Sequence, residues 1–484
     1  MMVRTTADQP ANESSSLLAA PRPSTIPPRH HPSTTTSSIF SMHDVPLVIA
    51  DSSDDEEESS APEQIAETRG TAGLTETVLN IAKTCLGTGI IALPFAAAQV
   101  EWWIHVTGTV LIALWCLICV QRLLSCLDLV QFIKKNRKME LPEGCSGLGE
   151  VAFFAHGKVG FHAMDIIFFG LLFMIIVAYL DAALGFLSDT FLRTANPLWN
   201  VLVPAIVIGW LTSGDDMESL SKISALGIGL ILFVFGIVIF GYGDVDNISG
   251  EWPTTSNQTT LQSFAQWYGT IVFGFGLVPL TYNFRASMKD KSNMMIASSC
   301  GLAGTSAMYI VLSGAVVLVF PAGRLQGDVL QLLPSESWLP TLVRLAMVGL
   351  VLTTAPLLVL PCGELIQDEV LPQDWSPLWI RLAICVAASV ITLYLPEFVF
   401  VLSFVGSCWC ILSFVIPPML HLALLQNVKR LRDNGTVNTN GMARWISSDW
   451  FHRSFWIDLG MLLFGIGATL ASSIYTFQSL LESA

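Results

Sequence analysis

The sequence predicts an all-α polytopic membrane protein. Of its 484 residues, 52% are hydrophobic and only 13% are charged, and the mean hydropathy is +0.59. Soluble domains of this size do not normally reach such values. Several apolar runs exceed the roughly 18 to 20 residues that cross a hydrocarbon core of about 30 Å. They lack the alternating pattern of outer-membrane barrel strands, so the spans are expected to be helices.

Residues 1–73 are expected to form a disordered, acidic, cytosolic tail, because they are rich in Ser, Thr and Pro and poor in core-forming residues. No apolar h-region of a signal peptide follows the start, and the acidic charge argues against a nucleic-acid interface. Glu13, Leu17 and Leu18 resemble the acidic dileucine signal by which adaptor proteins sort membrane proteins to endosomes, lysosomes or vacuoles. A plain linker is the alternative.

Residues 74–484 are expected to form a transmembrane domain with eleven helical spans. The fourth is the shortest and ends in polar residues. The expected spans are about 76–99, 101–125, 161–187, 198–213, 222–243, 263–283, 294–320, 338–361, 377–395, 398–424 and 454–479.

Charge in the loops predicts the orientation. With a cytosolic N-terminus, sixteen Lys and Arg residues lie in or near cytosolic loops and two lie on the opposite side. An odd number of spans then places the C-terminus in a lumen or outside the cell. The glycosylation sequons at Asn247 and Asn257 fall in the loop between spans five and six, on the same outer side.

The first span contains a stretch that favours a broken helix. Residues 83–94 read Lys-Thr-Cys-Leu-Gly-Thr-Gly-Ile-Ile-Ala-Leu-Pro, where glycine costs backbone entropy and Pro94 removes a donor. Inside a membrane, the backbone groups of a broken helix are tolerated where they line a cavity or hold a ligand. We therefore expect a substrate site at Leu86 to Gly89.

The sixth span repeats this pattern with Phe-Gly-Phe-Gly at residues 273–276 and with Pro279. Interrupted helices at corresponding places in two halves indicate an inverted-repeat transporter with its site at the midplane. The two repeats would cover about 76–243 and 263–424, a 5+5 arrangement, and the eleventh helix would be peripheral.

Together these motifs resemble the amino acid/auxin permease family, and most closely its proton-coupled and vacuolar members and the related sodium-coupled neutral amino acid transporters. The resemblance covers roughly residues 75–480. It rests on four stretches: residues 83–94, residues 273–276 with Met288 and Lys289, Thr353-Thr354-Ala-Pro356, and Phe404-Val-Gly406 with Ile416-Pro417.

The resemblance implies a leucine-transporter-like fold and coupled amino acid transport by alternating access between broken helices one and six. Backbone amides of the first break would bind the substrate carboxylate, and carbonyls and aromatic faces of the second would hold the amino group and close over the side chain. Phe275 is a candidate gate, with helix packing as the alternative. The expected substrate-binding residues are Thr84, Leu86, Gly87, Thr88, Gly89, Tyr179, Phe273, Gly274, Phe275 and Gly276.

The coupling ion is expected to be a proton rather than sodium. The Lys-x-x-Leu-Gly-Thr-Gly sequence beginning at Lys83 resembles the proton-coupled and vacuolar branches, and its ammonium group could stand in for a bound cation. Hydroxyls of Thr353 and Thr354 suit a sodium site, although mid-helix threonines often bond to carbonyls of their own helix. Asp181 is a candidate proton acceptor, with an interfacial or paired carboxylate as the alternative.

Other ionisable residues, among them His105, Glu364, Glu397, His421 and Asp458, fall near expected span ends, where snorkelling or loop exposure explains them without function. The sequence contains no His-Glu-x-x-His, P-loop or Gly-x-Ser-x-Gly motif, so no enzyme, metal or organic cofactor is expected.

The sequence thus predicts a symporter of amino acids in a lysosomal, vacuolar or endosomal membrane, with the plasma membrane as the alternative. An amino acid sensor that signals through its tail, a sodium-coupled carrier and a vesicular or auxin-like carrier are the rival functions. The sequence does not indicate an oligomeric state.

Overall fold

A computed structural model of the chain describes most residues after position 69. The described residues are 70, 72–136, 147–188, 190–191, 194, 196–212, 217–244, 252, 260–320, 325, 327–334, 337–369, 376–395, 398–433 and 448–483. The expected sorting signal at Glu13, Leu17 and Leu18 and the sequons at Asn247 and Asn257 lie outside the described residues, as does the Thr88 side chain.

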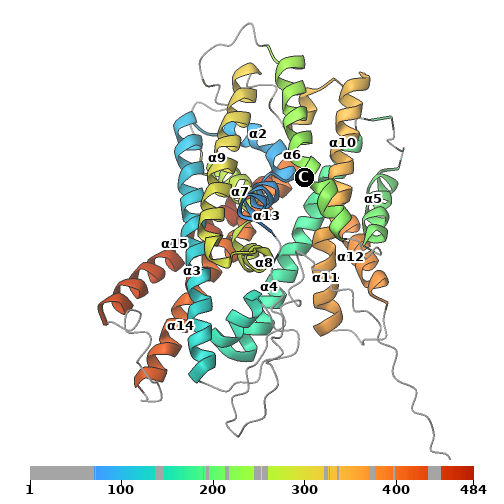
Figure 1. Ribbon diagram of the computed structural model, residues 1–484. Coiled ribbons are helices and arrows are strands. Elements are labelled where there is room, and N and C mark those ends of the chain that lie inside the picture. The colour runs from blue at the N-terminus through green and yellow to red at the C-terminus, as the bar shows by residue number, and fades with distance from the viewer. Residues whose placement is uncertain are drawn as a thin grey trace, which may run out of the picture. The chain divides into compact units, whose positions relative to one another are not determined.

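Helices make up nearly all of the described chain (Figure 1). Short 3-10 or π segments interrupt or connect several of them. The α-helices are α1 (Leu74–Cys85), α2 (Leu93–Ala98), α3 (Trp102–Asn136), α4 (Gly147–Ser188), α5 (Pro197–Leu211), α6 (Met217–Gly236), α7 (Leu261–Gly274), α8 (Thr281–Ser287), α9 (Met294–Val319), α10 (Trp338–Thr354), α11 (Pro356–Glu369), α12 (Pro377–Thr392), α13 (Phe398–Cys410), α14 (Ile416–Asp433) and α15 (Ser448–Ser483). The connecting segments are η1 (Thr88–Ala92), η2 (Ile237–Tyr242), η4 (Val278–Leu280), η5 (Lys291–Asn293), η7 (Val329–Leu332) and η8 (Ile411–Val415).

An all-α membrane protein is confirmed. Six helical segments of the described chain are apolar and long enough to cross a membrane, and a bent pair of helices would make a seventh. The six are Trp102–Asn136, Gly147–Ser188, Lys291–Val319, Trp338–Gln367, Phe398–Asp433 and His452–Glu482. Helices also lie in the other expected ranges but are shorter or broken, so the count of eleven spans and the 5+5 repeat stay predictions.

The closest helix contact in the core joins α7 to α13, at Gly269 and Gly406. A β-carbon at Gly269 would lie 2.0 Å from the Ser403 carbonyl oxygen, and one at Gly406 would lie 1.9 Å from the Gly269 carbonyl oxygen. The two backbones therefore touch directly. Small residues at such crossings gain van der Waals contact that larger side chains would prevent.

The last helix, α15, packs against α7, α13 and α14. A buried ion pair also holds it, because Asp458 accepts from His421 of α14 at 2.5 Å and lies 2.8 Å from the Arg122 Nε of α3. Asp458 and His421 are fully buried. A buried charge needs such partners to offset its lost hydration, so the ion pair fixes α15 to α3 and α14.

The long helix α4 is two helices joined at Gly157. This residue has φ 71° and ψ −157°, which a side chain would strongly disfavour. The second piece runs through the core and carries Tyr179 and Asp181, both buried.

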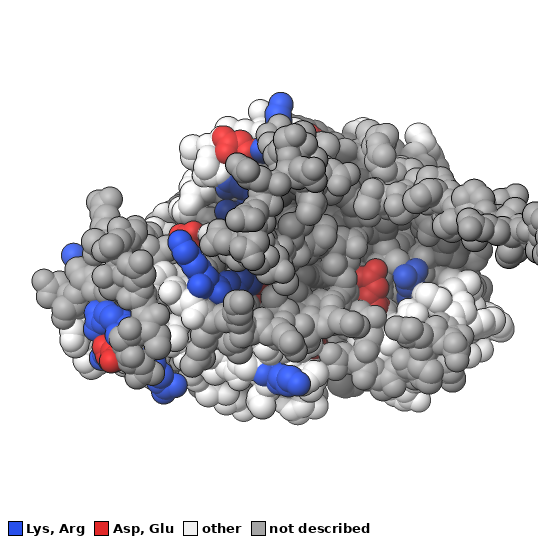
Figure 2. All heavy atoms as spheres, turned by 60° about the horizontal axis from the view of Figure 1, so that its bottom comes forward, with Lys and Arg blue, Asp and Glu red and all other residues white. Residues whose placement is uncertain are grey.

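The lower end of the bundle in Figure 1 carries basic side chains. Helix α3 has Lys134 and Lys135 in its last turn, and α14 has Arg430 and Arg432 in its last turn. Figure 2 brings this end forward and shows Lys and Arg spread over its described surface, with fewer acidic side chains. Near the end of the expected tail, Ala72 pairs with Met288 in a parallel bridge. The backbone of Ala72 is thus hydrogen-bonded to Ser287 and Lys289, at and just after the end of α8.

Candidate functional site

The first helix break lies where the sequence places it. Helix α1 ends at Cys85, and Leu86 leaves helical geometry with φ −83° and ψ 38°. Gly87 is extended, and η1 begins at Thr88. The segments Leu74–Cys85 and Gly89–Ala98 are bent by 52°. Pro94 does not make this break; it lies at the start of α2, where its missing N–H costs little.

The second break has the same form. Helix α7 ends at Gly274, and Phe275 caps it with φ −84° and ψ 54°. After Gly276 and Leu277, η4 begins at Val278, with Pro279 inside it. The chain then continues as α8. Each break therefore consists of a helix, a short non-helical turn, a 3-10 segment and a second helix.

The two breaks lie against each other. A β-carbon at Gly89 would lie 2.9 Å from Cδ1 of Phe273, so η1 and the end of α7 are in contact through this glycine. Tyr179 of α4 lies on the other side of the first break, where a β-carbon at Gly87 would be 3.3 Å from its hydroxyl. The structure thus brings together Gly87, Gly89, Tyr179 and Phe273, four of the residues expected to bind substrate.

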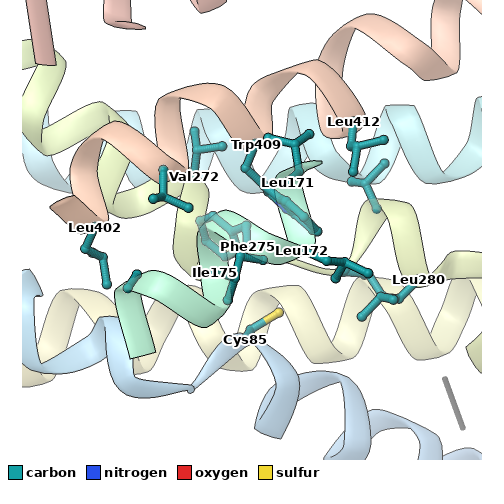
Figure 3. Packing of buried hydrophobic residues seen from close by; sticks show 14 of the residues in the cluster. Cys85, Leu171, Leu172, Ile175, Val272, Phe275, Leu280, Leu402, Trp409 and Leu412 are labelled. Carbon is teal, nitrogen blue, oxygen red and sulfur yellow. The ribbon is translucent and has the colours of Figure 1, made fainter. Parts of the chain in front are cut away.

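Phe275 fills the space beside the breaks (Figure 3). Its side chain is fully buried among apolar residues from α1, α4, α7 and α13. Those labelled around it in Figure 3 include Cys85, Leu171, Ile175, Val272 and Trp409. In this structure Phe275 packs as a core residue, which is one of its two expected roles.

Tyr309 of α9 contacts both breaks, although the sequence analysis does not single it out. Its hydroxyl donates to the carbonyl oxygen of Cys85, the last residue of α1, at 2.5 Å. Its ring packs on Phe275 with centroids 5.2 Å apart. A β-carbon at Gly274 would lie 2.2 Å from the Tyr309 hydroxyl, so this glycine makes room for the tyrosine.

A sequence signal for Tyr309 exists in the spacing of α9. Gly301, Thr305, Tyr309 and Ser313 recur every four residues and are all buried. Such spacing places them on one helix face. Small and polar residues on one face of an apolar helix indicate close helix packing with interhelical hydrogen bonds, which is how this face meets α1 and α3.

The threonines expected to bind substrate or sodium hold hydrogen bonds within their own helices. The Thr84 hydroxyl donates to the Asn80 carbonyl oxygen at 2.9 Å. Thr353 donates to Gly349 and Leu350, and Thr354 donates to Leu350 at 2.7 Å. Each oxygen keeps lone pairs for a cation, but its proton is used by the helix.

The other expected coupling residues lie on different helices. Lys83 is half-buried in the last turn of α1, and Asp181 is buried on α4 two residues after Tyr179. Thr353 and Thr354 end α10, which packs against α4. Lys83 therefore lies next to the first break along the chain, and Asp181 lies on the helix whose Tyr179 reaches that break, whereas the threonines come from a third helix.

Snorkelling at span ends is wrong for three of the residues to which the sequence analysis assigns it. His105, His421 and Asp458 are fully buried and hydrogen-bonded. The sequence could not show this, because the partners Ser313, Trp267 and Arg122 come from elsewhere in the chain.

Comparison with solved structures supports the same architecture. The fold is similar to that of Mhp1, a nucleobase-cation-symport-1 family transporter solved in a closed conformation with bromovinylhydantoin bound. The TM-score is 0.52 at 12% identity, over 86% of this chain and 94% of that one. At this identity the likeness concerns the fold alone.

Sequence comparison gives the family. The chain is 24% identical to amino acid transporter ANT1 of Arabidopsis thaliana, over 72% of this chain and 84% of that protein. It is 22% identical to the proton-coupled amino acid transporter-like protein pathetic of Drosophila melanogaster, over 72% and 76%. It is 24% identical to vacuolar amino acid transporter 5 of Schizosaccharomyces pombe, over 73% and 84%.

The family model described as transmembrane amino acid transporter protein matches residues 70–437. This range includes both helix breaks and the helices that hold them, from α1 to α14. The resemblance read from the motifs is confirmed, and with it the expectation of a transporter rather than an enzyme. The chain belongs to the transmembrane amino acid transporter family.

Proposed function

We propose that this protein is a proton-coupled carrier of amino acids that works by alternating access around a site between its two helix breaks. The observation that carries the proposal is the contact of Gly89 in η1 with the Phe273 ring at the end of α7, which brings the segments next to the two non-helical turns together in the core. Backbone of this kind is tolerated at membrane depth where it serves a ligand or ion.

In this proposal the first break binds the substrate carboxylate. The N–H groups at the start of a helical segment have no acceptor within that segment, and they point toward its positive end. Residues 87–89 have this position, because η1 begins at Thr88 and continues into α2. Gly87 and Gly89 place no side chains of their own over these amides, and the Tyr179 hydroxyl lies beside Gly87.

The second break would bind the amino group and enclose the side chain. Carbonyl oxygens at the end of α7 have no helical donors, and an ammonium group can supply three. Phe273 and Phe275 flank these carbonyls. Because Phe275 occupies the space between α1, α4 and α13 here, we propose that it moves aside when substrate enters and returns as the gate.

Proton coupling rests on the residues around the first break. Lys83 lies within the last turn of α1, and in this proposal its ammonium group stands in for the cation that a sodium-coupled carrier binds. Thr353 and Thr354 would be the sodium ligands in the alternative. The name of the Drosophila relative also favours a proton.

We further propose eleven spans, with a 5+5 inverted repeat over about 76–243 and 263–424 and an eleventh helix in α15. The basic end of the bundle in Figure 2 would face the cytosol, together with the tail of residues 1–73. A vacuolar or lysosomal membrane is supported by the Glu13, Leu17 and Leu18 signal and by the name of the Schizosaccharomyces relative.

Reconstitution into liposomes tests the function. Labelled amino acids are screened with a pH gradient and a sodium gradient imposed separately. Uptake that requires the pH gradient supports the proposal. Uptake driven by the sodium gradient alone would show that sodium, not a proton, is the coupling ion. Absence of flux with every amino acid under both gradients would overturn the proposal that the protein transports amino acids.

A further inference from the structure

His105 is a fully buried histidine in the first turn of α3, and both of its ring nitrogens are hydrogen-bonded. The indole N–H of Trp267, from α7, donates to its Nδ1 at 3.0 Å. Its Nε2 lies 2.8 Å from the hydroxyl oxygen of Ser313, from α9. One side chain thus joins three helices, one of which is the half-helix that leads to the second break.

These partners fix the protonation of the ring. An indole nitrogen can only donate, so Nδ1 must be the acceptor and carry no proton. The ring proton then lies on Nε2 and is donated to Ser313, whose own hydroxyl donates to the Tyr309 carbonyl oxygen at 2.5 Å. Every bond in this network is satisfied when His105 is neutral.

A second proton on His105 would place two hydrogen-bond donors face to face, the new Nδ1–H and the indole N–H of Trp267. It would bind at Nδ1 and point at the Trp267 N–H, so the hydrogen bond would be lost and a buried donor left without an acceptor. The indole has little space to turn away, because a β-carbon at Gly108 would lie 2.2 Å from its ring. Relief requires a displacement of α7 relative to α3.

We propose that His105 is the site that binds the coupled proton, and that the bound proton releases α7 from α3 and α9. The site takes one proton from solution, at Nδ1. Two contacts connect it to the breaks: α7 ends at Gly274, next to Phe275, and Ser313 donates to the backbone of Tyr309, whose side-chain hydroxyl donates to the Cys85 carbonyl oxygen. This inference rests on the proposed function and adds to it the place where the proton acts.

The described rings in contact with His105 are all aromatic side chains of tryptophan. Trp102 and Trp252 lie 6.0 and 6.4 Å from it between ring centroids, and Trp252 is held by a bond to the Val100 carbonyl oxygen. Helices α7 and α9 carry no acid or base, only tyrosines and Cys300, and the carboxylate just before α3, on Glu101, accepts from Trp103. No described charge on α7, α9 or the first turns of α3 would stabilise the protonated ring. Protonation would therefore break the hydrogen bond between His105 and Trp267.

Hydrogen–deuterium exchange of the full-length protein in nanodiscs tests the release without any substrate. Exchange of α7, residues 261–274, is compared with that of α12 at pH 7.5 and 5.5, which cancels the intrinsic effect of pH on amide exchange. In the wild type, acidification should lower the protection of α7 relative to α12 by about tenfold. In His105→Gln, which can accept from Trp267 and donate to Ser313 but does not titrate, the ratio should stay high at both pH values.

Two further variants complete the set. Trp267→Phe removes the donor, so α7 should be as weakly protected at pH 7.5 as the wild type at pH 5.5. His156→Gln, at an exposed position of α4, should behave as the wild type. A wild-type response to acid in His105→Gln, or wild-type protection of α7 in Trp267→Phe at pH 7.5, would overturn the release of α7.

Flux in liposomes separates this inference from the function on which it rests. If the wild type transports, His105→Gln should retain exchange of labelled for unlabelled amino acid and lose the dependence of net uptake on the pH gradient. Unchanged pH dependence in that variant would remove His105 as the proton site. If the wild type transports no amino acid, the proposed function fails, and the exchange data still decide whether His105 controls α7.

Discussion

The two helix breaks have nearly the same backbone and very different side chains. Leu86 and Phe275, which cap α1 and α7, differ by 1° in φ and 16° in ψ, from −83° and 38° to −84° and 54°. Yet the first break continues into Gly-Thr-Gly, whereas the second lies between Phe273 and Gly276. The same turn is followed by glycines in one half and is flanked by phenylalanines in the other.

The difference shows that the two breaks are packed in different ways. Glycines at 87 and 89 let the Tyr179 hydroxyl and the Phe273 ring approach the first break closely. The fully buried Phe275 side chain fills apolar space beside the breaks. The half-helices are also held differently: α7 meets α13 backbone to backbone at Gly406, whereas α1 meets α9 through the Ile81 side chain at Gly301.

The largest effect is expected from Gly406→Ala, which attacks the anchor of the second break. The new methyl group would lie 1.9 Å from the Gly269 carbonyl oxygen, and backbone on both sides must move. Overpacking of this kind costs about 1–3 kcal/mol of the free energy of unfolding. Thermal unfolding of the purified protein measures it.

Two glycines serve as comparisons for that anchor. At Gly301 the added methyl group would lie 2.6 Å from the Ile81 side chain but 3.6 Å from the Val78 carbonyl oxygen, an ordinary contact distance, so Gly301→Ala should destabilise less. Exposed Gly460 of α15 has open space, and alanine there should be neutral or slightly stabilising. Equal losses for Gly406→Ala and Gly301→Ala would show that the two half-helices are held alike.

A smaller but more specific effect is expected from Gly274→Ala, which acts on the link between the breaks. Its methyl group would lie 2.2 Å from the Tyr309 hydroxyl and push the ring away from Cys85. We expect amino acid flux to fall by about tenfold or more, because a misplaced site residue commonly has such effects. Initial rates of uptake in liposomes measure it.

A double mutant tests the stated cause. Tyr309→Phe removes the hydroxyl that Gly274→Ala would displace, so the combined loss should be smaller than the product of the two single losses. Multiplying losses would mean that Gly274 acts without Tyr309.

The sequence was sufficient to predict the helical class, the family and the position of both breaks, because these depend on local composition: apolar length for spans, Gly and Pro for breaks. It could not give the hydrogen bond of Tyr309 to the first break or the buried state of His105 and Asp458. Their partners lie 224, 208 and 37 residues away, at Cys85, Ser313 and His421, and only the packing of helices brings them together.

Tyr309→Phe alone should have a moderate effect on both breaks. The Cys85 carbonyl oxygen would lose its donor inside the core, at a cost of about 1–3 kcal/mol to the free energy of unfolding. Ring packing against Phe275 would remain. Thermal unfolding with Tyr394→Phe as the exposed control measures the loss; equal stability of the two variants would mean that the Tyr309 hydroxyl contributes nothing to holding α1.

The smallest effect is expected at the end of α10, where Thr354→Val removes a hydroxyl that already donates to Leu350 of its own helix. If proton-coupled transport uses the two breaks and no group of α10, pH-driven uptake by Thr354→Val should differ from the wild type by less than about twofold. The lost bond lies within one helix, and such bonds contribute little to stability. Thr353→Val should behave alike, since its hydroxyl donates to Gly349 and Leu350. Uptake is measured with and without sodium at constant pH gradient. Loss of a sodium-dependent component of uptake in these variants, with recovery when serine replaces the threonine, would instead show that α10 supplies sodium ligands. The sodium alternative would then be correct.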